Sequence, residues 1–230
     1  MAENQDQALL LRRIPYGDTS LICHFLTAHH GRIAVMARGA RRPRSPFRAS
    51  LEPLCSLQIS WRPGRTGMGM LTDIQRGQSL LEASQSLDGL ELIAIASRLF
   101  QEGDPHGFEE TVSALSFLAA RKQQQGLLAA VWHMLDLAGW LGNLFHCWQC
   151  GDEVAGSMSW QHGHLLCENC LQDGGNRMPV SAGLRKSIAG VLEGCNIQLS
   201  VENVSTWREI IRLVLKEHGL KATDSFKAQY

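Results

Sequence analysis

Four cysteines in two Cys-x-x-Cys pairs constrain the fold of this chain more than any other feature. Cys147 and Cys150 form the first pair, and Cys167 and Cys170 follow after sixteen intervening residues. Each Cys-x-x-Cys turn directs two sulfurs toward one point, and a hairpin between the turns brings all four together. This spacing is typical of a tetrahedral zinc site. Four thiolates leave no open position for a substrate, so we expect one structural Zn2+ ion in a module at residues 147–170.

Two alternatives stay open at this module. The pairs could be redox dithiols without metal, although a thioredoxin-type motif is single and follows a strand in a βαβ unit. His146, His162 and His164 also lie close enough in the sequence to compete as ligands, although a full set of sulfurs makes them a weaker choice. The other three cysteines are expected to be small buried apolar residues: Cys23, Cys55 and Cys195.

The formal net charge of zero conceals a strong difference between the two ends of the chain. Residues 1–80 carry eleven Arg, no Lys and five acidic residues, a net charge of +6. The remaining eleven basic and seventeen acidic residues give a net charge of −6. Such asymmetry suggests that the N-terminal part of the chain meets a polyanion.

The apolar segments and the cysteines indicate in which cellular compartment the protein is found. Charged or polar residues break every apolar stretch well before the roughly 18 residues that a membrane helix needs. Residues 1–20 lack a basic start followed by an apolar run, so no signal peptide is expected. Paired motifs within an odd total of seven cysteines favour metal ligands in a reducing compartment over disulfides. We therefore expect a cytoplasmic protein that does not contact a membrane.

The first third of the sequence is typical of short strands separated by tight turns. Turn compositions at residues 15–18 and 29–31 separate apolar alternations that are rich in β-branched residues. Strands are predicted at residues 8–14, 20–27, 32–37, 53–61 and 69–74. Five strands in so short a stretch suit a small closed β-barrel such as the oligonucleotide-binding (OB) fold, which we place at residues 1–78.

From residue 79 onward the spacing of apolar residues becomes helical. It predicts one helix through residues 92–99, a second over roughly 108–121 and a third through 128–135. The last clear helix is expected to begin at Thr206, because Thr206 and Glu209 match a capping box. The predicted fold class is therefore α+β, with the barrel followed by a helical domain at residues 79–230 into which the zinc module is inserted.

The second informative motif is a run of five arginines within residues 38–48. Two prolines in the run exclude a helix and interrupt strand pairing, so we expect an ordered loop that presents guanidinium groups. Arginine forks match phosphate oxygens, and Tyr16, Phe47 or Trp61 could offer a base a stacking surface. The alternative is a solvated loop that only keeps the protein soluble; the +6 charge of this region and its lack of Lys count against it. Nucleic-acid contacts are therefore predicted at Arg38, Arg41, Arg42, Arg44 and Arg48.

The sequence contains no recognisable motif of an enzyme. There is no Gly-rich phosphate loop that ends in Lys-Ser/Thr, no His-Glu-x-x-His and no serine nucleophile elbow. Glu109 and Glu110 are neighbours in a predicted helix and therefore point apart, which suits a solvated face better than an acid/base pair. We expect a protein without catalytic residues.

Several stretches of the sequence form a pattern that is known from one family. In the barrel region they are residues 16–21, 25–27, 30–32, 51–53 and the Ala-Arg-Gly-Ala-Arg-Arg stretch at 37–42. Further on, the helix that contains residues 135–141 leads into Cys147-x-x-Cys150-Gly151. Together these stretches cover most of the chain, and they resemble the family of the bacterial recombination mediator RecO.

The resemblance implies a function that composition alone does not. Members of the family bind single- and double-stranded DNA, anneal complementary strands, and work with RecR and single-stranded DNA-binding protein to load the RecA recombinase. By motif match, DNA contact is carried over to Arg38, Arg41 and Arg42, while Arg44 and Arg48 are added on charge alone. The zinc cysteines are not retained by every member, which implies a role in folding. We therefore expect a cytoplasmic, nucleoid-associated DNA-repair protein.

The resemblance also implies a site for a partner. The family's helical domain docks the acidic, apolar C-terminal tail of the single-stranded DNA-binding protein, and Arg121 and Lys122 are a basic pair near that region. Two other functions remain compatible with the barrel and the cysteines. One is a zinc-ribbon RNA-binding or translation-associated factor, which comparison of DNA and RNA affinity would reveal. The other is a redox-switched zinc chaperone, in which oxidant would expel zinc and start a holding activity.

Overall fold

The computed structural model describes residues 3–64, 67–102, 104, 106–121, 125–174 and 177–219. The chain forms two compact units, Met1–Ala120 and Arg121–Tyr230. The first two helices group with the barrel in this division. The domain boundary expected after residue 78 therefore stays a prediction.

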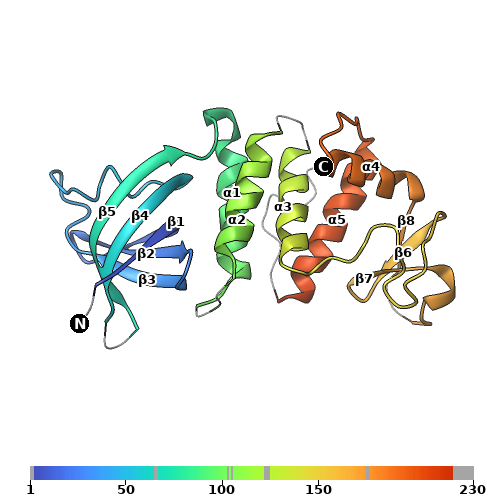
Figure 1. The fold of residues 1–230 in the computed structure, drawn as a ribbon, viewed down its shortest axis with the longest axis horizontal. Coiled ribbons are helices and arrows are strands. Elements are labelled where there is room, and N and C mark those ends of the chain that lie inside the picture. The colour runs from blue at the N-terminus through green and yellow to red at the C-terminus, as the bar shows by residue number, and fades with distance from the viewer. Residues whose placement is uncertain are drawn as a thin grey trace. The chain divides into compact units, whose positions relative to one another are not determined.

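Five strands in the first unit close into a barrel (Figure 1). They are β1 (Asn4–Tyr16), β2 (Ser20–Thr27), β3 (Gly31–Ala37), β4 (Cys55–Arg62) and β5 (Gly69–Ser79). Their order around the barrel is β1-β2-β3-β5-β4, with parallel pairing between β3 and β5 and antiparallel pairing between the other neighbours. This is the strand order of the OB fold, so the predicted barrel is confirmed.

Alternate residues of the strands fill the barrel with apolar side chains. Phe25, Val35 and Ile59 lie in this core and are completely buried. Cys23 and Cys55 lie in the same core, which confirms the prediction that they are buried apolar residues. Burial raises the pKa of Cys23 to about 12, so this thiol stays protonated at neutral pH.

A buried carboxylate fixes the turn between β2 and β3. The Nδ1 atoms of His29 and His30 lie 2.9 Å from Oδ1 and Oδ2 of Asp6, whose residue is 3% exposed. The backbone N–H groups of Gln7 and His29 also donate to this carboxylate, each at 2.8 Å. Burial alone would raise the pKa of Asp6, but the hydrogen bonds outweigh burial and hold the pKa below its ordinary value. Asp6 is therefore ionised at neutral pH.

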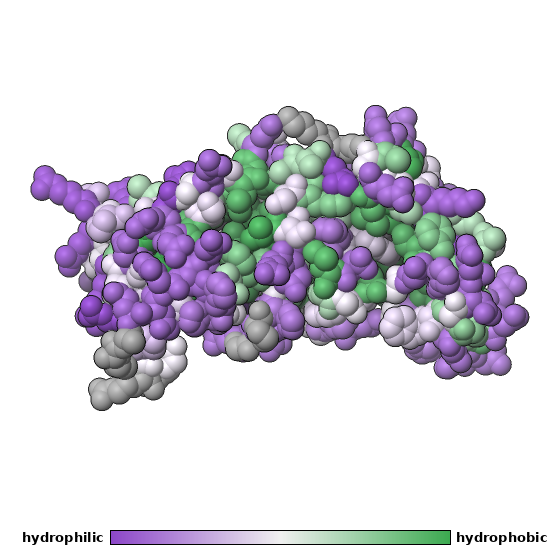
Figure 2. Space-filling model, in the orientation of Figure 1, coloured by the Kyte–Doolittle hydropathy of each residue, from purple (hydrophilic) through white to green (hydrophobic). Residues whose placement is uncertain are grey.

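Two helices complete the first unit, α1 (Ser86–Leu99) and α2 (Phe108–Ala119). Leu92, Ile95 and Leu99 form the buried stripe of α1. Gln85 Nε2 donates to the Leu118 carbonyl at 2.6 Å and so ties the start of α1 to the end of α2. Figure 2 shows hydrophobic residues at the surface over these helices.

In its described residues, the second unit has three α-helices and a small sheet. The helices are α3 (Gly126–Leu137), α4 (Ala182–Leu192) and α5 (Val201–Glu217). The sheet has the order β7-β6-β8, with β6 (Met158–Gln161), β7 (His164–Leu166) and β8 (Met178–Val180). Trp132 on α3 and Trp207 on α5 are buried, with ring centroids 6.2 Å apart in an edge-to-face contact. These tryptophans are core residues.

The start of α5 differs from the sequence-based prediction. The helix begins at Val201 because Ser200 Oγ accepts the N–H of Asn203 at 3.2 Å and caps it. Thr206 lies inside the helix, where its hydroxyl donates to the Glu202 carbonyl at 3.0 Å. The capping box predicted at Thr206 is wrong.

Two further features of the second unit differ from expectation. Helix α4 was not predicted, although Ser181 caps it by accepting the N–H of Leu184 at 3.1 Å. Cys195 follows α4 and is exposed, so the expectation that it is buried is wrong. It lies in the short connection between α4 and α5, and such connections run over the surface of a domain.

None of the helices in the described ranges combines the length and the apolar character that crossing a bilayer requires.

Candidate nucleic-acid interface and metal centre

The arginine run lies between β3 and β4, in a segment that we call the arginine loop (residues 38–54). Successive turns build it: the N–H of Arg42 donates to Gly39, that of Ser45 to Arg42, and that of Leu51 to Phe47, each at 3.0 Å. Ala40 and Leu51 belong to the barrel core, and Phe47 packs against it. The barrel therefore holds the loop in shape. All five arginines predicted to contact nucleic acid are exposed: Arg38, Arg41, Arg42, Arg44 and Arg48.

One flank of the loop forms a basic depression of about 290 Å³, here called the Arg41 hollow. Arg13, Arg41 and Arg48 line it, above Leu21, Ala40 and Leu51. Arg41 is held in place because its N–H donates to the Thr19 carbonyl at 2.8 Å and its Nη1 to the Gly17 carbonyl at 3.2 Å. Arg13 Nη1 donates to the Leu51 carbonyl at 2.7 Å.

A second depression of about 620 Å³, here called the Tyr16 hollow, lies where β1, the following turn and the end of β3 meet the loop. Arg38 and Arg42 line it with Tyr16. Gly39 has a positive φ of +66°, and a Cβ there would lie 3.5 Å from Arg42 Cδ, so the Arg42 side chain passes over this glycine. The other lining residues are Thr19, Ser20 and Met36. Within the described residues, neither hollow has an acidic side chain in its lining.

The structure distinguishes the three aromatic residues considered as stacking surfaces. Trp61 is 4% exposed in the barrel core, where the His30 ring packs edge-on against it at 4.9 Å between centroids. Phe47 is half-buried against the same core. Tyr16, in contrast, is 53% exposed and lines the Tyr16 hollow. Only Tyr16 of these three presents an open ring beside arginines.

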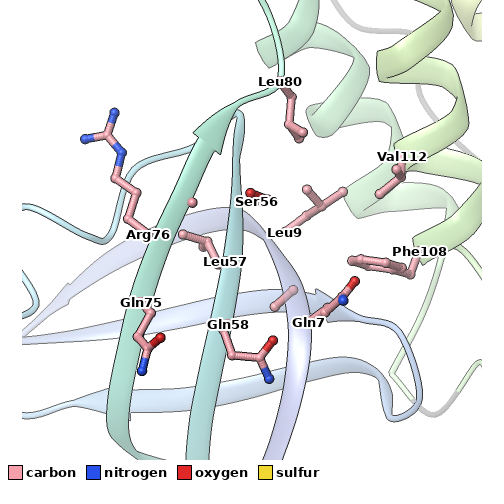
Figure 3. Close-up of a pocket in the computed structure, with 12 residues that line it drawn as sticks. Gln7, Leu9, Ser56, Leu57, Gln58, Gln75, Arg76, Leu80, Phe108 and Val112 are labelled. Atoms are coloured by element: carbon pink, nitrogen blue, oxygen red, sulfur yellow. The ribbon is translucent and has the colours of Figure 1, made fainter.

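A third depression, of about 370 Å³, lies on the outer face of the barrel (Figure 3). Gln7, Gln58 and Gln75 are paired across β1, β4 and β5, so their amides form one row over this depression. Leu9, Leu80, Phe108 and Val112 supply apolar surface beside the row (Figure 3). Sequence reasoning missed this depression; the only signal for it is the glutamines, which are ordinary surface residues until the register of three strands aligns them.

The basic pair considered for a partner's tail is only partly within the described residues. Arg121 Nη2 donates to the Leu192 carbonyl at 2.6 Å and its Nε to the Val191 carbonyl at 3.4 Å, both at the end of α4. Lys122 lies outside the described residues. Arg121 therefore has a structural contact with α4, and docking of a tail there stays a prediction.

The four cysteines of the two pairs converge as predicted. Their sulfurs all lie within 4.8 Å of one another, and those of Cys150 and Cys167 are 3.9 Å apart. A metal–sulfur distance of about 2.3 Å in a tetrahedron places sulfurs about 3.8 Å apart, so the cluster could hold one metal ion. The hairpin of β6 and β7 joins the pairs and turns at Gly163, which has a φ of +83°. The expected hairpin is confirmed.

Hydrogen bonds favour the thiolate form of one sulfur in the cluster, which is the form that binds a cation. Burial would raise the pKa of Cys147, but the N–H groups of Gln149, Cys150 and Cys167 point at its sulfur and lower the pKa to about 6. At Cys170, hydrogen bonding with the Cys167 sulfur and burial instead raise the pKa. Competition for protons among four close thiols is removed when a cation binds, because a coordinated sulfur is a thiolate.

Arg185 on α4 holds the backbone on both sides of the Cys147–Cys150 turn. Its guanidinium is 1% exposed and donates to the carbonyls of Leu144 at 2.6 Å, Val154 at 2.9 Å and Gly156. These carbonyls stand on both sides of the Cys147–Cys150 turn, so one side chain fixes the entry and exit of that turn. Burial lowers the pKa of Arg185 from its ordinary value. Sequence reasoning missed this residue because a lysine- or arginine-bearing helix surface usually faces water.

The surroundings of the cysteine cluster are acidic. Residues 123–176 contain no Lys or Arg and five acidic residues, among them Asp152 and Glu168 next to the metal-binding pairs. Trp148 is 57% exposed and stacks on His164, with ring centroids 4.0 Å apart. A region of this charge repels a polyanion, so the surroundings of the cysteine cluster do not favour nucleic-acid contact.

Comparison with known proteins supports the resemblance seen in the sequence. Residues 1–79 match the family described as recombination protein O N terminal, and residues 89–225 match recombination protein O C terminal. DNA repair protein RecO of Actinobacillus pleuropneumoniae serotype 5b is 33% identical over 170 residues, which cover 70% of this chain and 69% of the relative. DNA repair protein RecO of Rhodopirellula baltica is 31% identical over 188 residues, which cover 76% of this chain and 69% of the relative. The chain belongs to the RecO family.

Proposed function

We propose that this protein is a non-enzymatic DNA-binding mediator of recombinational DNA repair that anneals complementary strands. One observation carries the proposal: the barrel holds in shape a loop with five exposed arginines, four of which line two basic hollows. Guanidinium forks bind phosphate oxygens in a fixed geometry, and phosphates are repeated along DNA. Relatives that carry the name DNA repair protein support DNA over RNA as the partner.

Annealing needs no covalent chemistry from such a protein. Two single strands repel each other because both carry a phosphate charge at every nucleotide. Arginines that neutralise phosphates on both strands reduce this repulsion while the bases pair. The positions that matter are Arg38, Arg41, Arg42, Arg44 and Arg48, and none of them has to transfer a proton or form a bond. A protein with this role requires no catalytic residue.

We also propose that the cysteine cluster holds one structural Zn2+ ion. Four sulfurs at tetrahedral spacing suit zinc, and a closed shell has no position for a substrate. The ligands are Cys147, Cys150, Cys167 and Cys170. The ion would fix the two turns and the hairpin of β6 and β7 to the helices of the second unit. Its role is in folding, because the acidic surroundings do not suit DNA contact.

The partners proposed for this chain are those of its family. The protein would act with RecR on DNA coated by single-stranded DNA-binding protein, dock the C-terminal tail of that protein, and so help load RecA indirectly. It would bind single- and double-stranded DNA in the cytoplasm, at the nucleoid. No membrane contact is part of this function.

A strand-annealing assay on DNA coated by the cognate single-stranded DNA-binding protein tests the function. The wild-type protein should anneal complementary coated strands, because it can bind both the DNA and the coating protein. A variant with Arg38→Gln, Arg41→Gln and Arg42→Gln should lose annealing of coated and of naked strands. Annealing of naked strands alone by the wild type would confirm DNA binding and contradict the coating partner. Tighter binding of RNA than of DNA strands would move the function to the RNA-binding alternative.

A further inference from the structure

Four arginines of the arginine loop are divided between two hollows of different chemistry. Arg41 lines the Arg41 hollow with Arg13 and Arg48, where no aromatic residue is present among the described lining residues. Arg42, the next residue, lines the Tyr16 hollow with Arg38. Two neighbouring arginines therefore serve two separate depressions, of which only one offers an aromatic ring.

We propose that the Tyr16 hollow is a nucleotide subsite for single strands and that the Arg41 hollow is a phosphate subsite for single strands and duplexes alike. In the Tyr16 hollow, the tyrosine ring stacks on one unpaired base while Arg38 and Arg42 bind the adjoining phosphate. This inference rests on the proposed DNA-binding function and adds to it which form of DNA each hollow takes.

The position of Tyr16 suits stacking on a ligand. It is the last residue of β1 and pairs with Ser20 of β2, so its backbone is fixed by the barrel. Its ring is not part of the barrel core, unlike Trp61, and remains 53% exposed. Met36, which lines the same hollow, adds a polarizable apolar surface. Because the strand holds its backbone, Tyr16 has only two side-chain torsions to fix when a base stacks on it.

The volumes and charges of the hollows match the two ligands. The Tyr16 hollow, of about 620 Å³, lies within the size range of small-molecule sites and has room for a base with its phosphate. The Arg41 hollow, of about 290 Å³, has three arginines around a floor of Leu21, Ala40 and Leu51. Arg41 is already fixed by the Gly17 carbonyl, so it presents its remaining N–H groups to a phosphate in a set geometry.

The division has a consequence for annealing. A base in a duplex is covered on both faces by its neighbours, so it cannot stack on Tyr16. A single strand uses both hollows, whereas the annealed product keeps only the phosphate contacts of the Arg41 hollow. Pairing of the strands therefore removes part of the binding free energy and favours release of the product.

Tyr16→Leu tests the subsite because it removes the ring and keeps an apolar side chain. We expect affinity for a base-bearing single strand to fall about tenfold, from the effect of one lost stacking contact. Affinity for an abasic strand of equal length and for a duplex should stay within about twofold, and the slope of log affinity against log salt should not change. Fluorescence anisotropy with the three labelled ligands at several salt concentrations measures these values. Tyr16→Phe keeps the ring and should behave as wild type.

A matched pair of double variants separates the hollows. Arg38→Gln with Arg42→Gln should weaken single-strand binding more than duplex binding, whereas Arg41→Gln with Arg48→Gln, which removes the same charge, should weaken both to a similar extent. Equal effects of the two pairs on every ligand would overturn the division, as would an unchanged affinity of Tyr16→Leu for base-bearing strands. If no loop variant changes DNA binding or its salt slope, the proposed function itself fails, which is a distinguishable result.

Discussion

At the scale of single residues, burial and hydrogen bonding decide which polar groups are structural. Asp6 shows this clearly, because its two carboxylate oxygens face His29 and His30 and also accept two backbone N–H groups. The sequence places an ordinary acidic residue in a predicted strand region and gives no sign of this role. The two histidines come from a turn more than twenty positions away, so only the pairing of β1 with β2 brings them to Asp6.

The depressed pKa of Asp6 predicts how the barrel responds to acid. Its ionised form contributes stability above the ordinary aspartate pKa of 3.8, and this contribution is lost as the pH falls through the lower folded-state pKa. Asp6→Asn should reduce the free energy of unfolding at pH 7 by about 2 kcal/mol, because charge-assisted hydrogen bonds are lost. Urea unfolding at pH 7, 5 and 3 should show the variant and wild type converging in acid. Asp73→Asn, at an exposed position on β5, is the control and should change little.

At the scale of elements, local periodicity predicted the strands and the longest helical stripes. It failed where a β-bulge interrupts the alternation of a strand or where a cap sets the first residue of a helix. β1 extends over Asn4–Tyr16, and a register shift between Leu10 and Arg12 breaks the alternation that strand prediction depends on. The start of α5 was misplaced because Thr206 with Glu209 imitates a cap inside the helix. The convergence of the four cysteines into a cluster that could hold a metal ion was predicted, since their spacing is a local property of the chain. Arg185 could not be found, because its acceptors lie 29 to 41 positions away in the sequence.

Removing one ligand tests whether the cysteine cluster is a folding element. Cys147→Ser should lower zinc affinity by more than the roughly 10- to 100-fold that follows loss of a supporting residue, and should lower the unfolding midpoint. Annealing by the protein that remains folded should be largely unchanged. Zinc content by mass spectrometry, unfolding by circular dichroism and annealing are measured on one preparation. Cys195→Ser, an exposed cysteine outside the cluster, is the control. Strict dependence of annealing on zinc in a folded protein would contradict a structural role.

At the scale of the whole molecule, the two ends of the chain carry opposite net charges. Residues 1–80 carry +6 and the rest of the chain −6, and residues 123–176 contain no Lys or Arg. The sequence revealed this division and the arginine run, because charge can be counted without a structure. It could not sort the arginines between two hollows, which depends on turns of the arginine loop and on Tyr16 at the end of β1.

The salt dependence of DNA binding measures whether local contacts or net charge attract DNA. If Arg41, Arg42 and Arg44 each neutralise one phosphate, replacing all three by Gln should flatten the slope of log affinity against log salt for single strands by about 2 units. A control with Arg177→Gln, Lys186→Gln and Lys216→Gln removes the same charge from the second unit. The control should keep the wild-type slope. Equal slopes for both triple variants would show that net charge, and not the arginine loop, sets the salt dependence.

The uneven distribution of Lys and Arg also determines where trypsin, which cuts after these residues, can cleave the chain. The segment that contains the cysteine cluster has no such position from residue 123 to residue 176, so digestion leaves all four cysteines of the cluster on a single peptide that ends at Arg177. The arginine loop, in contrast, exposes several bonds to the protease. Protease footprinting of the native protein therefore reports on the arginine loop only, because a bound strand would shield the loop from cleavage. The segment with the four cysteines stays uncut, and mass spectrometry can weigh it together with any bound ion.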